Sequence, residues 1–164
     1  VEAARPNCAA LNRFALARIA ESHPDVVVLS GRWSSYPAYP QVAKTLDALR
    51  ALGIPRVILI GSSAQYHQPV PRLLLMALSS GAAPTRMHTR MMPKLREVDS
   101  TLRAVAARGG VSFIAPLDAQ CTALGCLVAL DTCAVGITTR DDGHLTPAGA
   151  IYIAERLFTP VLRP

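Results

Sequence analysis

The chain has 164 residues, of which 51% are apolar, 17% charged and 5% aromatic. A mean hydropathy of +0.28 excludes an intrinsically disordered chain, and no apolar run reaches the roughly 18 residues that a membrane span needs. The net charge of +6 suits an acidic polymer or a membrane surface, while the few aromatic residues disfavour a stacking platform for single-stranded nucleic acid. We expect one domain over residues 1–164.

The first half of the chain predicts helices that alternate with buried strands. Apolar residues at three- and four-residue intervals predict a helix over 7–23, which the next residue, a proline, ends. The β-branched run 25–31 predicts a central parallel strand that is buried on both faces. A second helix over 40–52 and a second buried strand over 56–61 follow.

The second half repeats this alternation after a long interruption. Residues 62–93 are expected to form an irregular insertion, of the kind that covers a site or contacts a partner. A helix over 93–108, a strand over 111–116 and a closing helix over 146–162 follow. The pattern indicates an α/β fold, a three-layer α/β/α sandwich around a central parallel sheet. Because no strand precedes the first helix, we expect a further strand upstream of residue 1.

The four cysteines are Cys8, Cys121, Cys126 and Cys133. Their spacing lacks the paired C-x-x-C or C…H patterns of zinc sites, so we expect no metal. Two interpretations stay open. A local disulfide, Cys121–Cys126, would imply an oxidising compartment, whereas the alternative is four buried free thiols.

The stretch with the clearest chemistry is 141–150, with the sequence DDGHLTPAGA, directly before the closing helix. A carboxylate three residues before a histidine can fold back and accept a hydrogen bond from the imidazole, which fixes the tautomer that a general base needs. Asp141 and His144 have this spacing, and Thr146 is a candidate N-cap behind them. An acidic loop with a surface histidine is the competing interpretation.

This D-x-x-H followed by L-[ST]-x-x-G-[AG] resembles the last block of SGNH (GDSL-type) hydrolases. The chain is most similar to the SGNH domain that is fused to acyltransferase-3 family membrane proteins, which O-acylate cell-surface glycans. Three further segments agree with that group, over a resemblance that runs from about residue 8 to 162: Cys8-x-x-x-Asn12 with Pro24–Trp33, Gly53-Ile54-Pro55 before Val57–Gly61, and the pair Cys121 and Cys126.

The resemblance implies a flavodoxin-like, SGNH-like fold and a Ser-His-Asp mechanism, with His144 as the base and Asp141 as its orienting partner. It implies a carbohydrate O-acyl transferase or esterase, O-acetyl in particular, without metal or organic cofactor. The partners would be a glycan acceptor, an acyl donor and a membrane acyltransferase module in the same polypeptide, with no nucleic acid. The location would be periplasmic or extracytoplasmic, tethered to the inner membrane.

One part of the family pattern is absent from the 164 residues. In the family the nucleophilic serine lies in a Gly-Asp-Ser block on the first strand, and this chain contains no Gly-Asp-Ser. We therefore expect an N-terminally truncated domain whose nucleophile lies on the upstream strand. The alternative places the nucleophile at Ser62 or Ser63, although a solvated or capping serine pair fits them better. His23 and His67 are expected at the surface.

Gly31, Arg32 and Trp33 follow the first predicted strand, at the strand end where ligands bind in open parallel sheets. The hydrolases carry a Gly-x-Asn-Asp block at this position. The Gly31 amide or the Arg32 guanidinium could stabilise the negative charge of a tetrahedral intermediate, and Trp33 could stack on a sugar ring. A packing turn is the competing interpretation.

Two other functions compete with the enzymatic one. A non-catalytic glycan-binding or interaction domain could keep the fold without a working triad. The basic stretch 85–96 could contact acidic glycan, lipid head groups or the membrane module, or be a plain exposed loop. A flavodoxin-like nucleotide binder is disfavoured, because no strand leads into a glycine-rich phosphate loop that opens a helix.

Overall fold

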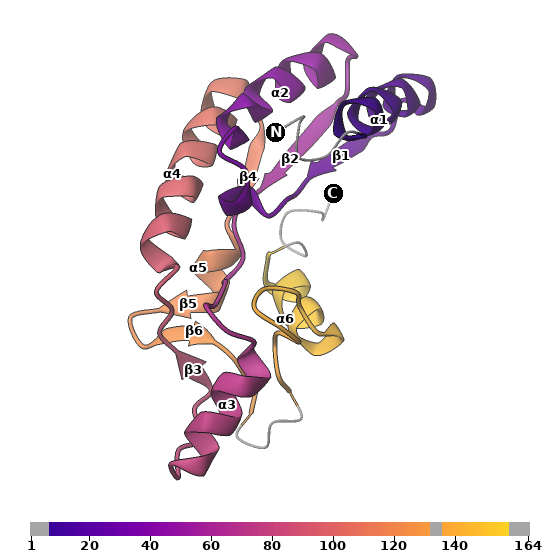
Figure 1. The fold of residues 1–164 in the computed structure, drawn as a ribbon. Helices are drawn as coiled ribbons and strands as arrows, with labels where there is room; N and C mark the ends of the chain where they lie inside the picture. Colours follow the sequence, from indigo (N-terminus) through magenta and orange to yellow (C-terminus); the bar gives the residue numbers. More distant parts are fainter. Residues whose placement is uncertain (1–6, 132–135, 158–164) are drawn as a thin grey trace. The chain divides into compact units, whose positions relative to one another are not determined.

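The computed structural model describes residues 7–131 and 136–157, which form helices, a parallel sheet and a small antiparallel sheet (Figure 1). The α/β prediction is thereby confirmed. By their contacts the residues divide into two compact units, each described by itself below. The first comprises residues up to Gly61 and Val98–Ile114, and the second Ser62–Glu97 and the residues from Ala115 onward. The single domain over residues 1–164 stays a prediction.

The first unit is built on a three-stranded parallel sheet in the order β1-β2-β4. Val27 lies opposite Val57 between β1 and β2, and Leu59 lies opposite Phe113 between β2 and β4. The elements of this unit are α1 (Cys8–Ser22), β1 (Val26–Leu29), the 3-10 turns η2 (Trp33–Ser35) and η3 (Tyr39–Gln41), α2 (Val42–Ala51), β2 (Arg56–Ile60), the later turns of α4 (Met92–Gly109), and β4 (Ser112–Ile114).

Side chains on one face of this sheet form the core of the first unit. Val27, Val57 and Leu59 alternate along the strands and pack against apolar residues of the three helices. The inward residues of the helices, spaced by three and four, are those that periodicity predicts: Leu46, Leu49, Val98, Leu102 and Val105 are all buried. Val42 is partly buried beside them.

The position of β1 within the sheet corrects one prediction. Residues 26–29 were expected to form a central strand with both faces buried. In the described sheet β2 is central, β1 is an edge strand, and Val28 is 47% exposed. A run of β-branched residues reports that a strand forms, but it carries no information about how many neighbours that strand has.

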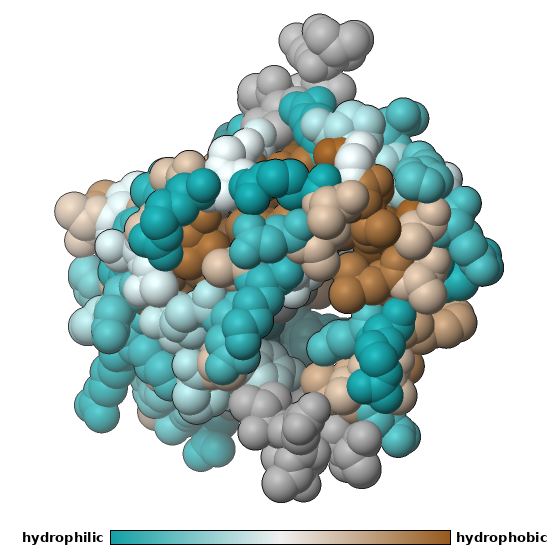
Figure 2. Space-filling model, turned by 90° about the horizontal axis from the view of Figure 1, so that it is seen from above, coloured by the Kyte–Doolittle hydropathy of each residue, from teal (hydrophilic) through white to brown (hydrophobic). Residues whose placement is uncertain are grey.

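Apolar side chains also reach the surface of the molecule. Figure 2 shows hydrophobic residues, in brown, between hydrophilic residues on the face that it views. On α1, Leu11 and Phe14 are about two-thirds exposed, and none of the helix's residues is fully buried. The helix ends as predicted before Pro24, with His23 in the left-handed conformation (φ 40°) and exposed to solvent.

The second unit holds an antiparallel sheet in the order β3-β6-β5 and three complete helices. Its core gathers residues from α3, the start of α4, α5 and β6, with partly buried methionines against them. The elements are α3 (Val70–Ser79), β3 (Arg86–Met87), α5 (Pro116–Gln120), β5 (Cys121–Thr122), β6 (Gly125–Leu127) and α6 (Pro147–Leu157). The closing helix was predicted to continue to 162, and residues beyond 157 lie outside the described ranges.

The prediction of an irregular insertion over 62–93 is wrong, because α3 and β3 form within it. Helix α3 begins with proline in its first turn, where the missing N–H costs nothing. Pro69 and Pro71 at the start of this helix are typical of loops, and that signal hides the apolar run 73–78 in the sequence. No helix within residues 7–131 and 136–157 is long and apolar enough to cross a membrane.

Cys121 and Cys126 form a disulfide, so the interpretation as four free thiols is wrong. The two residues face each other across β5 and β6, with 4.0 Å between their Cα atoms. Cys8 is a half-buried free thiol, and Cys133 lies outside the described residues. The disulfide fits an oxidising compartment.

Replacing both disulfide cysteines by alanine should lower the free energy of unfolding by about 2 kcal/mol. The bond closes a loop with a sequence separation of 5, and loop-closure entropy for so short a loop is of this size. Denaturant unfolding followed by circular dichroism measures the change, and Cys8→Ala serves as the matched control with little effect. Equal stability of the double variant and the control would contradict the prediction.

Candidate active site

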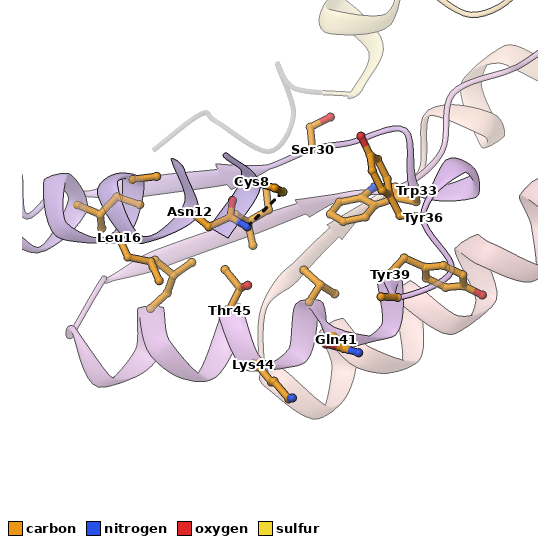
Figure 3. Close-up of a pocket in the computed structure, with 16 residues that line it drawn as sticks. Cys8, Asn12, Leu16, Ser30, Trp33, Tyr36, Tyr39, Gln41, Lys44 and Thr45 are labelled. Atoms are coloured by element: carbon orange, nitrogen blue, oxygen red, sulfur yellow. Dashed lines mark hydrogen bonds between the residues drawn. The ribbon is translucent and has the colours of Figure 1, made fainter. Parts of the chain in front are cut away.

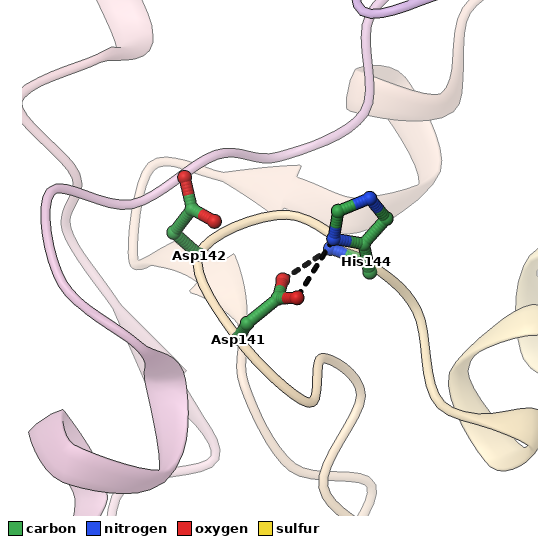
Figure 4. A group of neighbouring side chains, drawn as sticks. All are labelled: Asp141, Asp142 and His144. Carbon is green, nitrogen blue, oxygen red and sulfur yellow. Dashed lines mark hydrogen bonds and ion pairs between the residues drawn. The ribbon is translucent and has the colours of Figure 1, made fainter.

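Asp141 and His144 are hydrogen-bonded to each other at the loop before α6 (Figure 4). Asp141 Oδ2 lies 2.7 Å from His144 Nδ1, while the second ring nitrogen points away from Asp141. The histidine side chain is 63% exposed and the aspartate side chain 36%. An imidazole that is held at Nδ1 by a carboxylate presents Nε2 as a proton acceptor, which is the arrangement of a general base.

The other oxygen of Asp141 fixes the backbone of the same loop. Oδ1 accepts hydrogen bonds from the N–H groups of Gly143 (2.9 Å) and His144 (2.7 Å). These two donors, followed by the His144 ring, hold the pKa of the Asp141 carboxyl well below its usual range, although slight burial opposes them. The group is therefore a carboxylate at neutral pH.

Backbone pairing closes the loop around this pair. Thr139 and Leu145 form an antiparallel bridge, and the Arg140 N–H donates to the His144 carbonyl at 2.9 Å. The hydroxyl of Thr146 accepts a hydrogen bond from the Gly149 N–H at 3.1 Å, as predicted for an N-cap. The loop is thus tied both to a buried extended segment and to the start of α6.

A second segment, Ala64–Val70, binds the backbone of the acidic residues. The Tyr66 N–H donates to the Asp142 carbonyl at 2.8 Å, and the Val70 N–H donates to the Asp141 carbonyl at 2.9 Å. The segment itself is held by the buried Gln120, whose Oε1 accepts from the Ala64 N–H at 2.8 Å. These contacts join parts of the chain that lie far apart in sequence.

Tyr66 anchors this segment in the core of the second unit. Its side chain is 3% exposed, and its hydroxyl donates to the Leu127 carbonyl at 3.3 Å. Burial raises the pKa of the Tyr66 phenol above its ordinary value, although the nearby Arg86 opposes the shift. The phenol therefore stays protonated and keeps its donor role.

Gly149 is required by the close approach of α6 to the loop. A Cβ atom at this position would lie 2.1 Å from the Thr138 carbonyl oxygen, and the residue is buried. The glycine of the L-[ST]-x-x-G pattern is thus explained by packing, since no other residue fits without moving the helix.

Asp142 differs from Asp141 in its relation to the His144 ring. Asp141 is joined to the His144 ring by a hydrogen bond, whereas no such bond is drawn from the Asp142 carboxylate to the ring (Figure 4). Asp141, Asp142 and His144 each offer a ligand atom within 4.8 Å of the others. Because both oxygens of Asp141 already hold hydrogen bonds within the loop, we assign no metal site to this cluster.

Gly31, Arg32 and Trp33 lie in the first unit, after β1. Gly31 and Arg32 are exposed, and Trp33 is partly buried against the core. The Trp33 indole N–H donates to the Ile60 carbonyl at 2.7 Å, so its ring has a packing role there. Their roles in oxyanion or substrate binding stay predictions.

Trp33 also lines a largely apolar cavity of about 550 Å³ in the first unit (Figure 3). The rings of Trp33, Tyr36 and Tyr39 lie at one end of it and Leu16 of α1 near the other, while Thr45 points into it from α2. All of the lining residues belong to the first unit. Sequence reasoning missed this cavity, because its walls come from five separate elements, α1, β1, η2, η3 and α2.

The other candidate residues, Ser62, Ser63 and His67, belong to the second unit. The Ser62 side chain is buried at 1% exposure, so the expectation that it is solvated is wrong, while Ser63 is partly buried. His67 is exposed, as expected. Gln120 and Tyr66 were missed as parts of the site, because nothing in the sequence reports a contact across 56 residues.

The fold and the site together define a class of protein: an α/β domain with a paired aspartate and histidine directly before its last helix. The chain matches the SGNH domain (fused to AT3 domains) over residues 1–158 and belongs to that family. No curated protein matches it.

Among solved structures, the chain is similar to the periplasmic domain of a lipopolysaccharide acetyltransferase from Salmonella ser. Paratyphi A. The two share 21% sequence identity with a TM-score of 0.80, which shows a common fold. The match covers 94% of this chain and 63% of that chain, so the chain spans under two thirds of its length.

The loop should keep its hydrogen bonds as the pH falls through the range where an ordinary aspartate is protonated. Since the folded pKa of Asp141 is lowered, its contribution to stability is present above the unfolded pKa of about 3.9 and is lost only below that value. The amide signals of Gly143 and His144 measured by NMR against pH report the titration. A midpoint near 4 would contradict the prediction, and Asp141→Asn should remove the transition.

Gly149→Ala should lower the free energy of unfolding of the second unit by about 2 kcal/mol. The added methyl group meets a backbone carbonyl that cannot move without breaking the pairing of Thr138, so overpacking strain results. Ala150→Ser, an exposed neighbour on the same helix, is the control and should cost under about 0.5 kcal/mol. Denaturant unfolding of both variants tests this, and equal effects would refute the packing role.

Proposed function

We propose that the chain carries the base of an acyl-transfer enzyme, a carbohydrate O-acyl transferase or esterase, with O-acetyl as the group transferred. The observation that supports it most is the Asp141–His144 pair, with Nδ1 held by the carboxylate and the ring largely exposed. Membership of the SGNH family gives this pair its proposed role.

The proposed reaction has two half-steps that share one base. His144 Nε2 takes the proton of a serine hydroxyl, and the serine oxygen attacks the acyl carbonyl carbon. The tetrahedral intermediate collapses, the bond to the donor breaks, and the imidazolium returns the proton to the leaving oxygen. In the second half-step His144 deprotonates water or a sugar hydroxyl, whose oxygen attacks the acyl-serine ester. The acyl–serine bond then breaks, and the imidazolium returns the proton to the serine oxygen.

Asp141 acts as a positioning residue in this scheme. Its hydrogen bond to Nδ1 keeps the proton on that nitrogen and stabilises the imidazolium that forms during proton transfer. The two backbone N–H donors to its other oxygen keep the carboxylate ionised and fixed. The positioning role is assigned to Asp141 rather than to Asp142, because Asp141 is the residue whose carboxylate is bonded to Nδ1.

The nucleophile is proposed to be a serine of a Gly-Asp-Ser block outside these 164 residues, since the sequence contains no such block. The Gly31 amide and the Arg32 guanidinium are proposed as oxyanion or substrate-binding groups. Trp33 is proposed as a sugar contact through the part of its ring that its packing leaves accessible.

The proposed setting is the extracytoplasmic side of the inner membrane, with a membrane acyltransferase module in the same polypeptide as the source of the acyl group. The family description, a domain fused to AT3 domains, supports the partner. The Cys121–Cys126 disulfide supports an oxidising compartment. The similar Salmonella protein is described as a lipopolysaccharide acetyltransferase, which supports a glycan acceptor.

Labelling by a serine-reactive fluorophosphonate tests the proposal on the complete protein and on this 164-residue chain. Only the complete protein should be labelled, at a serine outside the chain, and His144→Ala should abolish the label. Asp141→Asn should slow labelling by about 10³–10⁴-fold, because the ring is then held in the wrong tautomer. Asp142→Asn is the matched control and should change the rate less than threefold.

Three other labelling results would each contradict part of the proposal. Peptide mapping of the label to Ser62 or Ser63 would place the nucleophile inside the chain and overturn that part of the proposal. Equal slowing by Asp141→Asn and Asp142→Asn would refute the positioning role. An unlabelled complete protein would favour the alternative of a glycan-binding domain without a working triad.

A further inference from the structure

Helix α3 is apolar on its outer face as well as on its inner one. Val70, Leu73 and Leu74 are buried in the core of the second unit. The opposite face exposes three large apolar side chains, with Leu75 67%, Met76 58% and Leu78 45% exposed. Large apolar side chains that are exposed together on one helix mark a candidate contact surface.

The chain segment that contains α3 carries charges of one sign. From Ser62 to Arg96 the sequence contains five Lys and Arg residues and no Asp or Glu. Two of the five, Arg86 and Arg96, bond to the protein itself. The other three, Arg72, Arg90 and Lys94, are exposed, and none pairs with a carboxylate among the described residues. Arg72 lies on the outer face of α3, one turn before Leu75 and Met76.

We propose that the outer face of α3 docks on an anionic lipid surface. Leu75, Met76 and Leu78 enter the boundary between head groups and acyl chains, with the helix lying in the plane of the interface. Arg72 keeps its charge at the head groups while its stem covers apolar surface. Arg90 and Lys94 add attraction to anionic head groups, and no acidic residue of the segment opposes it.

The chemistry of this face favours lipid over a protein partner. Lipid offers an apolar layer below a negative layer, which matches exposed apolar side chains on a helix whose outer face also carries Arg72. The three apolar side chains are flexible Leu and Met residues, which adapt to a fluid phase. The inference uses only α3 and its neighbours, so it does not rest on the proposed catalytic function.

Vesicle sedimentation of the 164-residue chain tests the docking. Binding should be measurable with vesicles of 30% phosphatidylglycerol in phosphatidylcholine and at least tenfold weaker with phosphatidylcholine alone. Leu75→Ser with Met76→Ser should weaken binding to the anionic vesicles by at least tenfold. The matched control is Ile151→Ser with Leu124→Ser, two similarly exposed apolar residues of the same unit, and it should change binding less than twofold.

The charge contribution is tested separately with variants that leave the apolar face intact. Arg72→Gln and Lys94→Gln should each weaken binding to anionic vesicles about fivefold, which corresponds to about 1 kcal/mol for each charge near the surface. Circular dichroism should show unchanged folding, because all the substituted residues are exposed. Failure to bind anionic vesicles, or equal loss in the Ile151 and Leu124 control, would overturn the proposal and leave a protein surface as the occupant.

Discussion

The Asp141 carboxylate is the group on which the geometry of the site depends. One of its oxygens accepts hydrogen bonds from the backbone N–H groups of Gly143 and His144, and the other is hydrogen-bonded to the imidazole of His144. The loop, the charge state of the acid and the orientation of the ring are thus fixed by one side chain. Charge-assisted hydrogen bonds of this kind are stronger than neutral ones, which suits a pair that is partly open to water.

The pair is also held from outside its own loop. The segment Ala64–Val70 donates two backbone hydrogen bonds to the carbonyls of Asp141 and Asp142, and the buried Gln120 holds that segment in turn. Loss of this hydrogen bond would leave a buried amide group without a partner, which lowers the free energy of unfolding by the desolvation cost of that group. The second unit therefore positions the loop before α6 through the segment that leads into α3, and Gln120 of α5 holds that segment.

Sequence patterns predicted the features that depend on neighbours along the chain. Helix α4 shows clear periodicity, and Asp141 and His144 are three residues apart, so both could be predicted. Helix α3 was missed, because the prolines at its start are typical of loops, whereas in the structure proline stands in the first turn of the helix. The edge position of β1 and the Gln120 contact depend on chain segments that only the fold brings together.

The motif at 141–150 is explained residue by residue through packing as well as chemistry. Asp141 accepts from the backbone, Thr146 caps α6, and Gly149 lets the helix approach the Thr138 carbonyl. A chain that had lost its activity would still need these residues to fold the loop. The motif therefore identifies the fold of the site, and activity is decided by what lies opposite the second nitrogen of His144. For this reason the nucleophile, rather than the motif, separates an enzyme from a binding domain.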